Sequence, residues 1–405
     1  MGGVVIVGAG QCGISAAEGL RRAGYEGAID VFGEEADAPY QRPPLSKQAL
    51  AGDLPLDRLA FRGPEFFEKN RIVVHLSTSV SEIRRSDKVV VTSDGATHPY
   101  EKLLLATGAR PRALGIQGRE LRNIFDLRTL SDVRALAPVL RKGRRITVIG
   151  GGFVGLEVAA TARQLGLAAT VIETADRLMP RVLTPFMSDW FANLHMTHGA
   201  TLLTGTTVSA FAGSGVVEAI VCDGKEIPTD IVVLGIGVVP NQELAGRAGL
   251  TCDDGIVVDE SCRTNDPDIF AAGDCARHPS IFYGRSVRLE SVHNANAQAR
   301  VVADAIVGKT SRYDEVPWFW SDQYDVRLQM VGLSQGHEHA ILRGNPADGK
   351  FSMFYVRDGA VIAADTVNNA SDFVQCRKGI PLRKTVDIDR LSDPGTSLAE
   401  ILRGA

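Results

Sequence analysis

Apolar runs that end in glycine-rich turns set the pattern of this chain. The β-branched run Val4–Val7 has no polar residue, which is typical of a fully buried strand, and it leads directly into Gly8-Ala9-Gly10-Gln11-Cys12-Gly13. This is a G-x-G-x-x-G fingerprint. Its first glycine permits a tight turn, its second lets the backbone approach a pyrophosphate, and its third lets the following helix pack close to the strand. The pattern therefore predicts a strand, a phosphate-binding turn and a helix whose free N–H groups face the phosphates.

The same unit occurs twice. A shift of 142 positions places Gly150-Gly151-Gly152-Phe153-Val154-Gly155 on the first fingerprint, again after an apolar run, Ile146–Ile149. Each unit also carries an acid about 20 residues further on, where the ribose 2′-hydroxyl of a dinucleotide is bound. These acids are Glu34 or Glu35 in the first unit and Glu173 in the second. Two complete units predict two dinucleotide sites, most simply one for FAD and one for a nicotinamide cofactor.

Three more buried strands are predicted to end in turns of small residues, where a ligand can approach the backbone. They close on Ala106-Thr107-Gly108, on Gly235-Ile236-Gly237 and on Ala272-Gly273-Asp274. The third turn presents Asp274 at the carboxyl end of its strand, which is the edge where open α/β sheets bind ligands.

Apolar spacing predicts helices over 130–141, 153–165 and 291–306, and Ser46 is predicted to cap a short helix that runs through Leu50. Beyond Pro317 the pattern changes to short strands up to about Val367, and the tail after Ile380 is polar and is predicted to be helical only near 398–402. The fold class that we expect is α/β, with two Rossmann-like dinucleotide-binding domains and a C-terminal α+β domain.

Composition narrows the class of protein. With 405 residues the chain has the length of two to three domains, and its net charge of −4 argues against a nucleic-acid binder. No apolar run approaches the length of a membrane span, and the N-terminus lacks the charged region of a signal peptide, so we expect a cytoplasmic protein. The six cysteines show no C-x-x-C spacing, which argues against a structural zinc or iron–sulfur site in this chain.

A rigid loop precedes the predicted short helix. Pro43 and Pro44 fix φ and remove two backbone donors, and the loop ends at Lys47. From the residues alone, Lys47 is either a solvated side chain at a helix start or a cation placed near a flavin ring, where it would favour the anionic reduced form.

Taken together, these motifs resemble a known family. The two fingerprints, the turns at Ala106-Thr107-Gly108 and Ala272-Gly273-Asp274, the segment Gly235–Asn241 and the segment Pro317–Gln323 are similar to those of the FAD-dependent, NADH-using ferredoxin reductases that serve class I cytochrome P450 systems and aromatic-ring dioxygenases. The resemblance covers essentially the whole chain. It implies a glutathione-reductase-like fold, with an FAD-binding domain formed by 1–108 and 242–316, an NAD-binding domain formed by 109–241, and a C-terminal domain formed by 317–405.

The resemblance also implies roles for individual residues. For NADH it implies the second fingerprint, Glu173 at the ribose hydroxyls, where its charge would repel a 2′-phosphate, and the turn at Gly237; Arg177 leaves NADPH open. The FAD contacts that it implies are Gly8, Gly10, Cys12, Gly13, Glu34, Pro44, Lys47, Val80, Ala106, Thr107, Gly108, Arg128, Gly273, Asp274, Val292 and Trp320.

Three further residues carry two interpretations each. Glu157, expected on the first turn of its helix, either complements the helix dipole or lies beside the nicotinamide, as the family implies. Glu290 is likewise either a charge at a helix start or a neighbour of the nicotinamide or flavin. Trp320 is either a core aromatic or, as in the family, a residue against the flavin where electrons leave.

The function that the resemblance implies is NADH-dependent reduction of a [2Fe–2S] ferredoxin, which in turn supplies a cytochrome P450 or an oxygenase. An NADH oxidase or a flavin-binding redox signalling protein of the same fold is the alternative. Because ferredoxins are usually acidic, basic residues are expected at the docking surface: Arg62 and Arg300 first, then Arg288 and Arg312, with ordinary solvated arginines as the other interpretation. We expect a monomer or weak homodimer that binds neither nucleic acid nor membrane.

Overall fold

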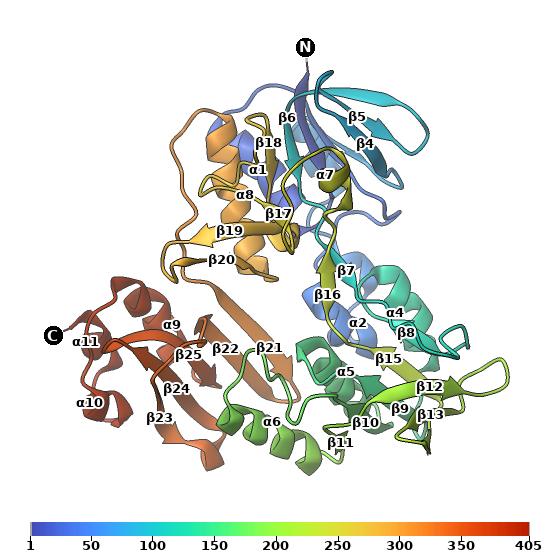
Figure 1. The fold of residues 1–405 in the computed structure, drawn as a ribbon, viewed down its shortest axis with the longest axis vertical. Helices are drawn as coiled ribbons and strands as arrows, with labels where there is room; N and C mark the ends of the chain where they lie inside the picture. The colour runs from blue at the N-terminus through green and yellow to red at the C-terminus, as the bar shows by residue number, and fades with distance from the viewer. Residues whose placement is uncertain (1, 405) are drawn as a thin grey trace. The chain divides into compact units, whose positions relative to one another are not determined.

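The computed structural model describes residues 2–404, which divide into two units (Figure 1). Unit 1 consists of residues 2–41, 59–110 and 239–317, and unit 2 of residues 42–58, 111–238 and 318–404. The chain passes between the units five times, and three of these crossings lie within the elements η2 (Leu56–Leu59), β7 (Ala109–Pro111) and β16 (Val238–Pro240).

Unit 1 is built on a sheet in the order β3-β2-β1-β6-β5-β4, with β18 beside β6. Five strands run parallel, namely β3, β2, β1, β6 and β18, whereas β5 pairs antiparallel with both β6 and β4. A smaller sheet has the order β17-β19-β20. The elements of unit 1 are β1 (Gly3–Val7), α1 (Gln11–Ala23), β2 (Ile29–Phe32), α3 (Pro64–Lys69), β3 (Ile72–His75), β4 (Val80–Arg84), β5 (Val89–Thr92), β6 (Thr97–Leu105), α7 (Glu243–Arg247), β17 (Ile256–Val257), β18 (Ile269–Ala271), η4 (Gly273–Cys275), β19 (Ala276–Ser280), β20 (Arg285–Arg288) and α8 (Val292–Ile306).

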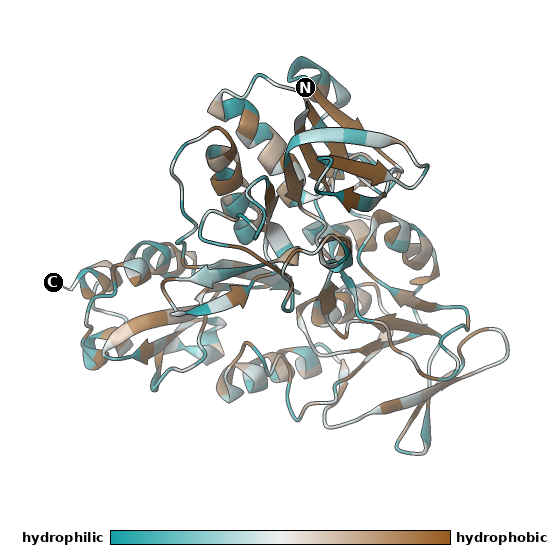
Figure 2. Ribbon diagram, turned by 45° about the horizontal axis from the view of Figure 1, so that its top comes forward, coloured by the Kyte–Doolittle hydropathy of each residue, from teal (hydrophilic) through white to brown (hydrophobic). Residues whose placement is uncertain are grey.

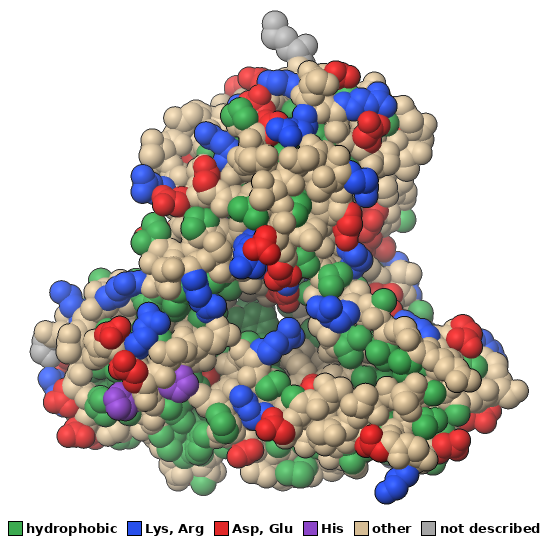
Figure 3. Space-filling view, viewed as in Figure 1, with side chains coloured by type: hydrophobic (Ala, Val, Ile, Leu, Met, Phe, Trp, Pro, Cys, Tyr) green, Lys and Arg blue, Asp and Glu red, His purple; other side chains and the backbone are tan. Residues whose placement is uncertain are grey.

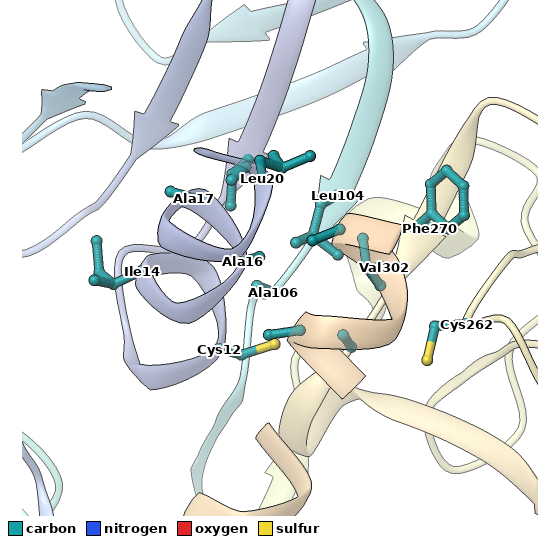
Figure 4. Packing of buried hydrophobic residues seen from close by; sticks show 14 of the residues in the cluster. Cys12, Ile14, Ala16, Ala17, Leu20, Leu104, Ala106, Cys262, Phe270 and Val302 are labelled. Atoms are coloured by element: carbon teal, nitrogen blue, oxygen red, sulfur yellow. The ribbon is translucent and has the colours of Figure 1, made fainter. Parts of the chain in front are cut away.

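The first strand is buried on both of its faces, as its unbroken apolar run predicts. Val4 and Ile6 pack in a cluster with α1 and α8. Val5 and Val7 pack in a second cluster that includes Leu250 and other residues of the segment 239–317. In Figure 4, Ala16 and Leu20 of α1 and Val302 of α8 belong to the first cluster. Figure 2 shows the strands of this sheet as mostly hydrophobic. The sheet therefore holds β1, and the turn after it, in a rigid place.

The part of unit 2 formed by residues 42–58 and 111–238 repeats this plan. Its parallel sheet has the order β11-β10-β9-β15-β8, and a second, antiparallel sheet has the order β12-β13-β14. The elements are η1 (Pro43–Ser46), α2 (Gln48–Ala51), β8 (Ile124–Asp126), α4 (Leu130–Leu136), η3 (Ala137–Val139), β9 (Arg145–Ile149), α5 (Phe153–Gln164), β10 (Ala168–Ile172), α6 (Pro185–Thr197), β11 (Thr201–Leu203), β12 (Val208–Ala212), β13 (Ala219–Cys222), β14 (Lys225–Pro228) and β15 (Ile231–Leu234).

The C-terminal part of unit 2 is an antiparallel sheet in the order β21-β22-β25-β24-β23, accompanied by helices. Its elements are β21 (Trp318–Gln323), β22 (Val326–Gly332), β23 (His339–Asn345), η5 (Pro346–Asp348), β24 (Lys350–Arg357), β25 (Ala360–Val367), α9 (Ala370–Gly379), η6 (Ile380–Leu382), α10 (Ile388–Ser392) and α11 (Leu398–Arg403). Two parallel α/β sheets and this α+β domain confirm the predicted fold class.

Three local predictions need correction. The helix expected over 130–141 ends as an α-helix at Leu136 and tightens into η3, because Pro138 cannot donate a backbone hydrogen bond. Ser46 does not cap the short helix: Lys47 holds the N-cap position of α2, and the Ser46 hydroxyl bonds elsewhere. The tail contains α10 as well as α11, because Asp387 accepts hydrogen bonds from the backbone N–H groups of Asp389 and Arg390. No helix within residues 2–404 is long and apolar enough to cross a membrane.

Candidate functional site

The first fingerprint forms a cradle that only glycine allows. Gly8 has φ +117°, and a Cβ there would lie 2.1 Å from the carbonyl oxygen of Ala106. A Cβ on Gly13 would lie 1.9 Å from the carbonyl oxygen of Gly8. Gly10 is different, because a Cβ on it would meet no protein atom within 4 Å. Packing thus explains Gly8 and Gly13, and the open space in front of Gly10 is what a pyrophosphate at the N-terminus of α1 requires.

The second fingerprint repeats this geometry. Gly150 has φ +109°, and its Cβ would lie 2.3 Å from the carbonyl oxygen of Gly235, the counterpart of Ala106. The Cβ of Gly155 would lie 2.1 Å from the carbonyl oxygen of Gly150, and Gly152 again faces no atom within 4 Å. Unit 2 therefore presents a second cradle that fits a dinucleotide.

The acidic residues of the two units occupy different places. Glu173 is the first residue after β10, and its Oε2 and Oε1 accept hydrogen bonds from the backbone N–H groups of Gly151 (2.7 Å) and Ala175 (2.8 Å). In unit 1 the first residue after β2 is Gly33, whose Cβ would lie 2.7 Å from that of Ala9. Glu34 follows as an exposed residue, and Glu35 accepts a hydrogen bond from the Tyr40 hydroxyl at 2.5 Å. The candidate acid of unit 1 is thus displaced along the chain.

The other candidate residues of unit 1 gather at the carboxyl ends of its strands. A Cβ on Gly273 would lie 3.1 Å from the Cβ of Cys12, which places the β18 turn against the first fingerprint. The Gly273 N–H donates to Oε1 of the buried Gln298 at 2.7 Å. Thr107 and Asn241 exchange hydrogen bonds, 2.6 Å from the Thr107 hydroxyl to the Asn241 carbonyl and 2.8 Å in return from the Asn241 side chain. Sequence reasoning missed Gln298, which has no local motif to mark it.

In unit 2, Lys47 and Glu157 form a buried ion pair. Lys47 Nζ lies 2.6 Å from Glu157 Oε2, and the two side chains are 14% and 6% exposed. Ser46 Oγ donates to the same carboxylate oxygen at 2.5 Å, and Ser321 Oγ donates to Oε1 at 2.7 Å. Because α5 begins at Phe153, Glu157 lies in the second turn rather than the expected first. The carboxylate is therefore held by side-chain donors, and the interpretation as a helix-dipole charge is wrong.

This ion pair also explains why residues 42–58 belong to unit 2, whereas the expected division assigned them to the FAD-binding part. Ser46 and Lys47 bond to Glu157, and Thr161 Oγ1 on the same helix donates to the Ser46 carbonyl at 2.8 Å. Arg42 Nη1 donates to the carbonyl of Arg128 at 2.6 Å, and Pro44 lies in η1 beside these residues.

The remaining candidates are placed as follows. Trp320 lies in β21, is half-buried, and its ring centroid is 5.8 Å from that of Trp318. Glu290 pairs with Arg288 at 2.7 Å, just before Ser291, whose side chain caps α8. Half-buried positions in unit 1 are Val80 in β4, Asp274 in η4 and Val292 at the start of α8; in unit 2, Gly237 has φ +92°.

The basic candidates all contact acids within unit 1. Arg62 pairs with Glu18 at 3.1 Å, Arg300 pairs with Glu315, and Arg312 pairs with Glu260 at 3.1 Å. Arg62 and Arg300 are both exposed. Figure 3 shows Lys and Arg side chains interspersed with Asp and Glu over the face that it displays. The arginines are thus partly neutralised by neighbours rather than gathered into one strongly positive field.

Comparison with known proteins identifies the class. A family model described as pyridine nucleotide-disulphide oxidoreductase matches residues 2–299, and one described as the reductase C-terminal domain matches residues 318–402. The chain therefore belongs to the pyridine nucleotide-disulphide oxidoreductase family, which confirms the resemblance drawn from the motifs.

Individual relatives narrow this class. The chain is 43% identical to putidaredoxin reductase CamA of Pseudomonas putida, over 99% of this chain and 97% of that protein. It is 42% identical to the ferredoxin--NAD(+) reductase component of the anthranilate 1,2-dioxygenase system of Burkholderia cepacia, over 98% of each chain. Among solved structures, the covalent putidaredoxin reductase–putidaredoxin complex matches with a TM-score of 0.97 and 42% identity, covering 100% of this chain and 99% of that one.

Proposed function

We propose that this protein is an NADH-dependent ferredoxin reductase, which takes electrons from NADH by way of FAD and passes them singly to a [2Fe–2S] ferredoxin that supplies a cytochrome P450 or a ring-hydroxylating oxygenase. The observation that carries the proposal is the pair of glycine cradles, each open only in front of its middle glycine. Relatives named as reductases of ferredoxin systems match over almost the whole chain.

FAD fits the cradle of unit 1. Gly8, Gly10 and Gly13 would hold its pyrophosphate at the N-terminus of α1, and Cys12, which packs against Gly273, would line the same cradle. When bound, FAD supplies the chemistry that links a two-electron donor to a one-electron acceptor. Contacts with Glu34, Val80, Ala106, Thr107, Gly108, Asp274 and Val292, and with Pro44, Lys47, Arg128 and Trp320, are those that the resemblance implies.

NADH is the proposed electron donor at the second cradle. Glu173 sits at the carboxyl end of β10 as an acceptor for ribose hydroxyls, and its charge disfavours a 2′-phosphate. Arg177 is committed elsewhere, since its guanidinium donates to the carbonyls of Leu183 (2.7 Å) and Pro180 (3.1 Å) and to Ser188 Oγ (3.1 Å). This commitment supports NADH over NADPH, because the arginine that could have bound a 2′-phosphate is already bonded.

Lys47 and Glu157 are proposed to place charge where electrons are exchanged. The pair is nearly neutral as a unit, and the Ser46 and Ser321 hydroxyls satisfy the carboxylate, so a lysine ammonium is kept in a largely buried place. Glu290 is proposed as a neighbour of the nicotinamide or flavin, and Trp320 as the aromatic on the path by which electrons leave.

For the partner surface we propose Arg62 and Arg300. Both are exposed, and each pairs with an acidic side chain of this chain. In the complex, a carboxylate of the acidic ferredoxin would take the place of that side chain as the partner of the arginine. We propose the domain limits stated for the resemblance, of which residues 1 and 405 lie outside the described part. We also propose a cytoplasmic location. All six cysteines are free thiols, which suits a reducing compartment.

An anaerobic titration tests the proposal. The purified protein is examined for a flavin spectrum, mixed with NADH or NADPH, and then assayed for cytochrome c reduction with and without a [2Fe–2S] ferredoxin. We expect rapid bleaching of the flavin by NADH, slower bleaching by NADPH, and cytochrome c reduction that depends on the ferredoxin. Flavin that NADH reduces without onward transfer to any of several ferredoxins would favour the NADH oxidase or signalling alternative.

A further inference from the structure

A continuous line of buried hydrogen bonds leads away from Glu157 inside unit 2. Ser321 Oγ lies 2.7 Å from Glu157 Oε1, and Gln323 Nε2 lies 3.1 Å from Ser321 Oγ. Gln323 Oε1 lies 2.9 Å from His195 Nε2, and His195 Nδ1 lies 3.2 Å from the Tyr324 hydroxyl. Ser321, Gln323 and His195 are at most 1% exposed. Neither the fold class nor the fingerprints require polar groups in these buried positions.

Strand geometry explains how the line forms. In β21 the residues Phe319, Ser321 and Gln323 alternate with Trp320 and Asp322, so they share one face of the strand. Phe319 packs on Phe153 with ring centroids 4.7 Å apart, and Ser321 bonds to Glu157 one helical turn further along α5. β21 therefore lies along α5 with Phe319 opposite Phe153 and Ser321 opposite Glu157. The next residue on the same face, Gln323, contacts His195 of α6.

The charge of Glu157 gives this line a direction. An ionised carboxylate only accepts hydrogen bonds, so the Ser321 hydroxyl donates its single hydrogen atom to Glu157. Gln323 must then present its NH₂ group to Ser321 and its carbonyl oxygen to His195. His195 must carry its proton on Nε2, which leaves Nδ1 to accept from the Tyr324 hydroxyl. Burial lowers the pKa of His195, in accord with a neutral ring. Every donor thus points toward Glu157, and bonds aligned in this way strengthen one another.

We propose that Ser321, Gln323 and His195 are positioning residues for Glu157: they hold its carboxylate turned so that Oε2 faces Lys47, and they hold β21, the strand that carries Trp320, against α5. This inference rests on the proposed function, in which Glu157 and Lys47 act at the cofactors. It assigns the C-terminal domain a part in reduction of the flavin by NADH, through a strand that is separated from Glu157 by more than 160 residues of sequence.

The kinetic test is anaerobic stopped-flow mixing of the FAD-loaded enzyme with NADH. Ser321→Ala removes the donor to Oε1 and is expected to lower the limiting rate of flavin reduction about tenfold, a change of about 1.4 kcal/mol, because it deletes one hydrogen bond to a charged group. The apparent Kd for NADH should stay within about twofold of wild type on the same argument. Ser321→Thr, which keeps the hydroxyl, should restore the rate.

Asp322→Asn is the matched control. Asp322 lies on the opposite face of β21 and pairs with Arg327, so the rate should not change. Equal rates for wild type and Ser321→Ala, or equal losses in Ser321→Ala and Asp322→Asn, would overturn the proposal. A wild-type enzyme whose flavin NADH does not reduce would instead overturn the proposed function, so the two failures are distinguishable.

A spectroscopic test does not depend on turnover. In the FAD-loaded enzyme labelled with ¹⁵N-histidine, the His195 ring, assigned by its loss in His195→Gln, should be neutral at pH 7 and protonated on Nε2. A ring protonated on Nδ1, or doubly protonated, would contradict the direction of the line and overturn the proposal.

Discussion

The two strand–turn–helix units share their strand pairing and the hydrogen bond of the turn, but they differ in their side chains. Val7 pairs with Phe32 as Ile149 pairs with Ile172, and the first fingerprint glycine of each unit donates to the carbonyl of the second strand's last residue, at 2.8 and 2.7 Å. Yet Ser15 of α1 corresponds to Glu157 of α5, and Gly33 corresponds to Glu173. The repeated residues build the cradle, and the differing ones are those that we propose to select the ligand and its chemistry.

The second difference has a steric origin. The residue after the second strand touches the second residue of the fingerprint, so one of the two must be small. Unit 1 combines Ala9 with Gly33, and unit 2 combines Gly151 with Glu173, where a Cβ on Gly151 would lie 3.3 Å from that of Glu173. A unit can thus carry an acid at this point only if it gives up the side chain opposite.

The largest effect is expected from the third fingerprint glycine. Gly13→Ala and Gly155→Ala each place a methyl group about 2 Å from a backbone oxygen that cannot move away. We expect each to lower the free energy of unfolding by about 3 kcal/mol, measured by urea denaturation. Gly13→Ala should also abolish FAD retention, whereas Gly155→Ala should keep FAD and lose NADH. Loss of FAD from both variants would contradict the assignment of the two cradles.

The middle glycines should separate binding from folding. Because a Cβ on Gly10 or Gly152 meets no protein atom, alanine there should change the stability of the cofactor-free protein by less than about 0.5 kcal/mol. Gly10→Ala should weaken FAD binding, and Gly152→Ala should weaken NADH binding, each at least about tenfold, because the methyl group enters the space of the pyrophosphate. Isothermal titration of both ligands with both variants measures this. A variant that binds both ligands normally would show that its cradle is not a dinucleotide site.

Exchange of the acid should alter coenzyme choice. Glu173→Gln keeps the size of the side chain but removes the charge that opposes a 2′-phosphate. We expect kcat/KM for NADH to fall about tenfold while that for NADPH stays level or rises, a shift of about 1.4 kcal/mol in preference. Unchanged preference would mean that Glu173 does not contact the ribose. Gly33→Glu offers the reverse exchange in unit 1 and should destabilise the fold, because its Cβ would lie 2.7 Å from that of Ala9.

The units should also respond oppositely to pH. In unit 2, burial raises the pKa of Asp365 to about 7, which the hydrogen bond from Tyr355 only partly offsets. An unfolded aspartate ionises near pH 3.9, so the folded state alone holds this proton between about pH 4 and 7, and stability falls as pH rises through that range. Asp365→Asn should flatten this slope in the urea midpoint.

In unit 1, the hydrogen bond from His293, followed by that from Arg300, lowers the pKa of Glu315 to about 2. Stability from this group is present above its unfolded pKa of about 4.3 and is lost as pH falls toward 2. Glu315→Gln should therefore reduce acid sensitivity. Parallel pH profiles for wild type and either variant would show that the group in question does not contribute.

Sequence patterns predicted what is encoded within one local unit. The strands, turns and helices of both cradles follow from runs of about ten residues in which each glycine has a local reason. The pairing of Lys47 with Glu157 could not be predicted, because 110 residues separate them and neither has a partner in its own motif. The Ser46 prediction failed for a related reason. A serine before a helix is a common cap, but a buried carboxylate from α5 attracts its hydroxyl more strongly than backbone N–H groups do.

The fixed register of β21 on α5 also has a consequence for recombination between relatives. Consider a chimera that takes residues up to Pro317 from one reductase and the remainder from another. Its α5, which carries Glu157, would pack against a β21 from a different protein. Helix α5 and strand β21 should therefore be inherited together, although they are far apart in the gene. An exchange made at the boundary of the C-terminal domain would still separate Glu157 from the strand that it contacts.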